Sequence, residues 1–207
     1  MMSKVAESVE SYLLQLCQQA KDLGASQAVA IPAVDIVLDE RCSLKCLVPL
    51  CSHYGVDLMC PPNLLPVSQF KEILKCYDSA ILIKVDVSQG DPSMSTEEEE
   101  PSEIPAAEYM NAVREAKKKL HEIVCQVESF CIRNGYYFAA GLVGGSCPLC
   151  EECVGVKSGL PCRYPFKARP AMEAMGIDVM ATTKKVGLDL SFGQNEGRSW
   201  VGLVLVS

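Results

Sequence analysis

The sequence predicts an α/β fold in which two pseudo-repeated halves form a small mixed sheet covered by helices. Two observations lead to this prediction. Short, strand-length apolar segments alternate with longer segments whose apolar residues recur at helical spacing. Both halves, about residues 28–87 and 136–206, also run in the same order of strand, cysteine loop, helix and strand. A chain of 207 residues suits one domain, in which a long helix over 105–133 would join the halves.

The elements up to the end of the first half follow from local patterns. Residues 3–23 carry apolar side chains at helical spacing, and Gly24 is a typical stop. Residues 28–38 alternate like a strand, and Pro32 marks an edge or a break in it. After the first cysteine loop, a helix and then a buried strand are expected over 67–77 and 80–87.

The second half follows a polar, acidic segment over 88–104, which we expect to be a flexible loop. The long helix should end at Asn134 and Gly135. The elements expected beyond it are a strand over 136–143, two short helices over 170–175 and 179–186, and a final apolar strand over 200–206.

The composition, with twelve cysteines and a net charge of −7, limits the classes of function that the chain can have. No apolar run reaches the roughly 18 residues of a membrane span, and the N-terminal segment lacks the apolar stretch of a secretory signal. We therefore expect a cytoplasmic protein whose thiols stay reduced, which favours metal ligation over disulfides. Six of the acids lie between residues 91 and 103, so the rest of the chain is nearly neutral and shows no basic surface for nucleic acid. No nucleotide-binding glycine motif indicates a flavin or nicotinamide site.

The clearest motif is the segment from Gly144 to Pro165, whose cysteines are Cys147, Cys150, Cys153 and Cys162. Three close cysteines and a fourth more distant one are typical of a loop that holds a [4Fe-4S] cluster, in which each iron takes one thiolate. Structural zinc is a less favoured alternative, because zinc sites usually pair two separated knuckles. Gly144 and Gly145 are predicted to contact the cofactor, since a close backbone approach requires small residues.

A second set of cysteines lies in the first half, at Cys42, Cys46, Cys51 and Cys60. Eight residues separate Cys51 from Cys60, as they separate Cys153 from Cys162. We therefore expect Cys46, Cys51 and Cys60 to be metal ligands. Cys42 would be the fourth ligand if the repeat is complete. Otherwise another group or an open iron would complete the site.

The remaining cysteines and both histidines have simpler interpretations. The cysteines outside the loops are expected in the core, as small apolar side chains. His121 is expected at a solvated helix position. His53 lies inside the first loop and could donate to a cluster sulfur or ligate iron, but an ordinary loop residue is the favoured interpretation. Near the loops, Arg41, Arg163 and Arg169 are expected to form surface contacts or ion pairs.

The segments RCSLKCLVPLCSHYGVDLMCPPN and CPLCEECVGVKSGLPCRYPFKARPAMEAMGIDV resemble a family of predicted metal-binding proteins, domain of unknown function 2284, found largely in methanogens and other anaerobes. The resemblance spans nearly the whole chain and implies metal binding. The motif of this family does not decide whether Cys42 is a ligand. It covers seven other cysteines, which are Cys46, Cys51, Cys60, Cys147, Cys150, Cys153 and Cys162.

Three functional hypotheses follow. The leading one is a protein with two [4Fe-4S] clusters that transfers electrons to or from a redox partner protein, with the two loops packed close together around one core. The second is an enzyme in which the first loop leaves one iron open to a substrate. The third is an interaction module stabilised by zinc.

Overall fold

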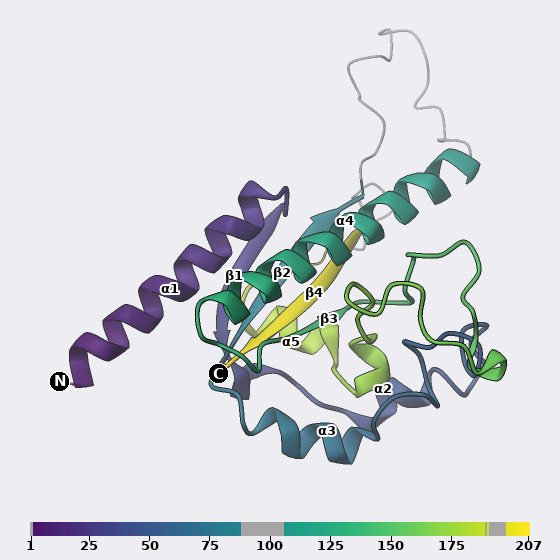
Figure 1. Cartoon of the computed structure of the whole chain (residues 1–207), viewed down its shortest axis with the longest axis horizontal. Coiled ribbons are helices and arrows are strands. Elements are labelled where there is room, and N and C mark those ends of the chain that lie inside the picture. Colours follow the sequence, from purple (N-terminus) through teal and green to yellow (C-terminus); the bar gives the residue numbers. More distant parts are fainter. Residues whose placement is uncertain (1, 88–105, 189, 191–197) are drawn as a thin grey trace, which may run out of the picture.

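The computed structural model describes residues 2–87, 106–188, 190 and 198–207 (Figure 1). The expected loop over 88–104 lies outside these residues. In chain order the elements are α1 (Met2–Asp22), β1 (Gln27–Pro32), η1 (Ala33–Asp35), α2 (Glu40–Leu44), α3 (Val67–Leu74), β2 (Ser79–Asp86), α4 (Ala106–Arg133), β3 (Ala140–Val143), η3 (Val156–Ser158), η4 (Glu173–Met175), α5 (Val179–Lys185) and β4 (Ser199–Val206).

The predicted α/β class is confirmed, with four strands in the order β1-β2-β4-β3. The expected mixed sheet is wrong in one respect, because every pair of neighbouring strands is antiparallel. Apolar patterning could not show this. The strands β2 and β4 are buried on both faces, so they read as continuous apolar runs, which are also typical of parallel strands. The internal duplication of the two halves stays a prediction.

Two hydrophobic cores lie on the two faces of the sheet. Successive side chains of a strand point to opposite faces, so Ile81 and Ile83 pack with α1 and α4, whereas Ala80 and Leu82 pack with α3 and η4. Figure 1 shows α1 and α4 crossing one face of the sheet, with α3 away from them. The sheet thus separates two apolar layers, each covered by its own helices.

Helix α4 lies unusually close to the sheet. A Cβ atom added to Gly202 of β4 would lie 2.6 Å from Cγ2 of Val124, and one added to Gly141 of β3 would lie 2.7 Å from Cγ1 of the same residue. Glycine at these two positions lets the helix approach the strands. This contact fixes the position of α4, which passes beside both cysteine loops.

The loops that carry the cysteines lie side by side beyond the sheet, around α2 and η3 in Figure 1. The amide of Val156 in the second loop donates a 3.0 Å hydrogen bond to the carbonyl oxygen of Val56 in the first. The amide of Ala171 likewise donates to the carbonyl of Met59, at 3.3 Å. Segments a hundred residues apart in the sequence are therefore joined directly by their backbones.

Three local predictions are wrong. Residues 136–139 form a turn instead of the start of β3, and Tyr136 stacks on Tyr12 with ring centroids 4.7 Å apart. His121 is only 1% exposed instead of solvated, because it lies on the face of α4 that carries Leu120 and Val124. Cys76 is exposed and does not belong to the core. Among the described helices, none has the length and apolar character that crossing a membrane requires.

Candidate metal centre

The second cysteine loop surrounds a single cavity of about 190 Å³. All four predicted ligands of this loop line it: Cys147, Cys150, Cys153 and Cys162. The backbone amide of Tyr164 donates to Sγ of Cys162 at 3.3 Å, which is an N–H···S bond of the kind that stabilises thiolates. The four cysteines of this loop therefore lie around a common space, and their role as metal ligands stays a prediction.

The electrostatics of these thiols favour a bound cation. Burial raises the pKa of Cys147 to about 11, an amide contact from Leu149 lowers it, and the charges of the other three cysteines of the loop raise it further. Ionisation of the Cys147 thiol is therefore costly without a bound cation. A soft metal removes this cost because it binds the deprotonated form of each thiol.

The first loop brings together Cys46, Cys51 and Cys60. Burial raises the pKa of Cys60 to about 12, and the charges of Asp57, Cys46, Cys51 and Cys147 raise it further. Burial also raises the pKa of Cys46, with the charge of Cys51 next in importance. The charges of cysteines from both loops thus act on the thiol of Cys60.

Cys42 has a different environment. Burial raises its pKa, followed by the charges of Asp178 and Asp39, and no cysteine contributes to the shift. It lines a larger cavity together with Cys46 and Cys51. Its role as the fourth ligand stays a prediction.

Within the described parts of the chain, no group of three or more His, Cys, Asp or Glu side chains is arranged to hold a single metal ion. In an iron–sulfur cluster each thiolate binds a different iron, so the ligands lie around the cluster. The kind of metal group that the cysteines bind stays a prediction.

The two glycines predicted to contact the cofactor have their amides directed at protein oxygens. The amide of Gly144 donates to the carbonyl of Val201 at 2.7 Å, and that of Gly145 donates to Oε2 of Glu173 at 3.0 Å. A Cβ on Gly145 would lie 2.7 Å from the ring of Trp200, and its φ is +72°. Close packing against β4 thus accounts for these glycines, and their contact with a cofactor stays a prediction.

Lys117 is a site residue that the sequence analysis did not identify. Its ammonium Nζ lies 2.9 Å from Oγ of Ser146 and 4.8 Å from the ring centroid of Trp200. Burial lowers its pKa, and the charges of Glu173, Cys147, Cys60 and Asp57 raise it. A signal was available in the sequence, because Lys117 falls on the apolar stripe of its helix, three residues before Leu120.

His53 also belongs to the site. It lines the cavity of the second loop although it lies in the first, and its Nδ1 is 2.6 Å from Oδ2 of Asp57. The sequence favoured an ordinary loop residue and left a role at the metal site as the alternative. Its position follows from the contact between the two loops, which no local pattern could reveal.

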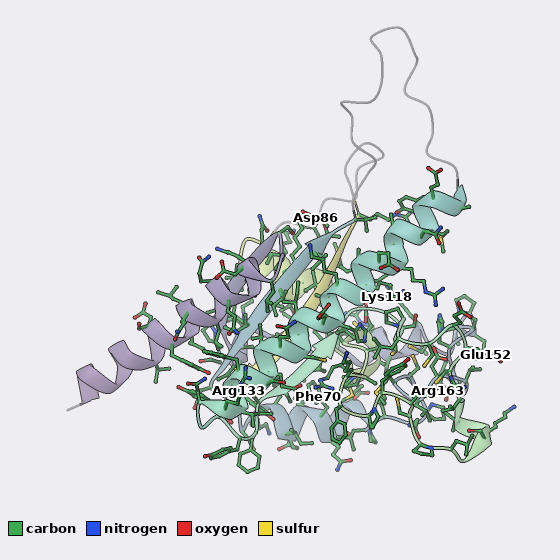
Figure 2. The ribbon with its side chains drawn as sticks, turned by 45° about the horizontal axis from the view of Figure 1, so that its top comes forward. Phe70, Asp86, Lys118, Arg133, Glu152 and Arg163 are labelled. Carbon is green, nitrogen blue, oxygen red and sulfur yellow. The ribbon has the colours of Figure 1, made fainter. Side chains whose placement is uncertain are left out.

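The arginines near the loops form local contacts, as expected. Arg41 pairs with Asp39, and Nε of Arg169 lies 2.8 Å from Oε2 of Glu128. Arg163 donates to the backbone carbonyl of Glu152 at 2.7 Å. Figure 2 shows Glu152 and Arg163 at the end of the molecule that carries the cysteine loops, far from Arg133 at the other end of α4.

Two adjoining cysteine loops on an α/β framework define this chain as a protein of the metal-binding class. The comparison with known families agrees. The chain belongs to the family described as Predicted metal-binding protein (DUF2284), whose model matches residues 29–206. No curated protein and no solved structure matches the chain.

Proposed function

We propose that the protein binds two [4Fe-4S] clusters and transfers electrons to or from a redox partner protein. The observation that carries the proposal is the arrangement of the second loop, whose four cysteines line one cavity. The first set, with Cys46, Cys51 and Cys60 grouped and Cys42 beside them, would hold the other cluster. When bound, each cluster would supply a one-electron redox couple.

The surrounding residues would hold the clusters and tune their potentials. The amide of Tyr164 stabilises the thiolate of Cys162. Lys117 brings a positive charge toward Cys147 and Cys60, which are cysteines of different loops. Because Cys60 is electrostatically coupled to both loops, two clusters held there would be near neighbours, and electrons could pass between them.

The surface of the two cysteine loops supports the proposal that a partner protein binds there. Large apolar side chains are exposed in both, at Leu47, Val48, Leu50, Leu160 and Phe166. Exposed apolar side chains concentrated at one site are typical of an interaction surface, and transient redox complexes need only a small one. We place this activity in the cytoplasm, since all twelve cysteines are free thiols.

Metal analysis of the protein, purified without oxygen, tests the proposal. We expect iron and acid-labile sulfide in equal amounts, corresponding to two four-iron clusters, and an EPR signal of interacting clusters after reduction. Replacing Cys150 with Ser should remove one cluster, whereas replacing the exposed Cys76 with Ser should change neither iron content nor spectrum.

Other outcomes separate the alternatives. A colourless protein with zinc and no sulfide would contradict both iron–sulfur hypotheses. Replacing Cys42 with Ser should cost one cluster or its normal potential if Cys42 is a ligand. An unchanged cluster in this variant would instead indicate a site with an open iron.

A further inference from the structure

A cavity of about 890 Å³ lies next to the first cysteine loop, and most of its lining residues are not among the cysteines proposed to hold a cluster. This volume lies within the range of small-molecule binding sites, which are mostly apolar with a few polar groups. Its apolar lining comes from the segment around α5 and from β4, at Ile177, Val179, Met180, Leu190, Trp200 and Val201.

Two cationic side chains and two carboxylates also line the cavity. The carboxylates and the cations differ in the hydrogen bonds and ion pairs that they already form. Glu173 accepts a hydrogen bond from the amide of Gly145, and Asp178 accepts one from the amide of Ala181 at 2.9 Å. Both carboxylates are therefore already bound to backbone N–H groups.

The cations of the cavity are Lys45 and Arg198. Within the part of the chain that the structure describes, neither forms an ion pair with a carboxylate. The guanidinium of Arg198 lies over the ring of Tyr109, 5.4 Å from its centroid, which restricts its orientation without neutralising it. Among the described residues, these two cations are therefore the charged groups of the cavity that remain available to a ligand, whereas the two carboxylates already accept hydrogen bonds and keep their negative charge.

We propose that this cavity binds a small organic carboxylate with an apolar body. Arg198 would bind the carboxylate, because a guanidinium matches its geometry, and Lys45 would add charge. The ring of Trp200 and the apolar lining would contact the body of the ligand. The ligand would then lie beside Cys42, Cys46 and Cys51, which line the same cavity. Binding itself does not depend on which metal these cysteines hold.

Calorimetric titration of the protein, as purified without oxygen, tests the proposal, with 3-phenylpropionate and its neutral amide, 3-phenylpropionamide, as probes. Trp200 is the only tryptophan, so its fluorescence reports independently on the same cavity. We expect the acid to bind and to change this fluorescence, and the amide to bind at least about tenfold more weakly.

Variants locate the carboxylate. Arg198→Met should weaken binding of the acid about tenfold or more, and Arg198→Lys should weaken it less. Lys71→Met, on the exposed face of α3, is the matched control and should change nothing. Circular dichroism and iron and sulfide content of each sample show that the variants are folded and equally loaded, so a failure of metal binding is seen separately from a failure of ligand binding.

Three results would overturn the proposal. The first is equal affinity for the acid and the amide, which would mean that the cavity does not recognise the charge. The second is unchanged binding in both Arg198→Met and Lys45→Met, which would place the acid elsewhere, for example on a metal. The third is no heat and no fluorescence change with the acid at about 10 mM, the millimolar range in which even weak specific binding is detected.

Discussion

The ammonium of Lys117 lies 2.9 Å from the hydroxyl oxygen of Ser146, the residue just before Cys147. This contact joins α4 to the second cysteine loop. It brings a half-buried positive charge to the place where the two loops meet, since Cys60 and Cys147 both act on the pKa of this lysine. Four predictions follow from this and neighbouring contacts.

Replacing Lys117 with Met should lower the reduction potential of the bound clusters. Reduction adds negative charge, and a nearby cation stabilises the reduced state. Redox titration followed by EPR measures the shift. Lys118→Met is the matched control, because Lys118 pairs with Glu115 at 2.8 Å instead of reaching the loops. Equal potentials in the Lys117 and Lys118 variants would contradict the role of Lys117.

His121 should make the protein less stable in mild acid. Burial lowers its pKa to about 4, and no hydrogen-bond partner of its Nε2 is found among the described residues. The unfolded chain therefore binds a proton near pH 6.5 that the folded chain does not, so stability is full above this pH and falls as the pH decreases toward 4. The loss attributable to this group is at most about 3 kcal/mol.

Urea unfolding between pH 7.5 and 5 checks this, with a His121→Gln variant for comparison. The free energy of unfolding should depend less on pH in the variant. Parallel curves for the two proteins would show that His121 has the same pKa in the folded and unfolded states.

Removing either partner of the ion pair between Arg169 and Glu128 alone should strongly lower the free energy of unfolding. Both side chains are largely buried, and Oε1 of Glu128 also accepts the amide of Gly141 at 2.9 Å. Arg169→Met would leave a buried carboxylate unpaired, at a cost of about 3 kcal/mol. Replacing both residues with apolar ones should cost less than the sum of the single changes. Strict additivity in chemical denaturation would argue against a coupled pair.

Gly202→Ala should destabilise the protein by about 2 kcal/mol, because the new methyl group would lie 2.6 Å from Cγ2 of Val124. The free energy of unfolding measures this cost. The same change in a Val124→Ala background should cost clearly less, because the smaller side chain leaves room for the methyl group. An unchanged cost in that background would mean that α4 does not limit the space above β4.

The sequence alone determined the local chemistry of this protein. A triple of cysteines at two-residue gaps lies within one loop, and apolar spacing predicts α1, α3, α4 and α5, because both depend on neighbours in the chain. The short helix α2 was not predicted. Membership of the metal-binding family could be inferred from the same residues.

The tertiary structure decided which distant groups meet. The placement of Cys60 near Cys147, the entry of His53 into the cavity of the second loop, and the reach of Lys117 to Ser146 all depend on the antiparallel sheet and on α4 packing against Gly141 and Gly202. Spacing along the chain carries no information on such pairs. The free energy that brings them together comes from burying both faces of the sheet, and it is shared among many residues far from the cysteines.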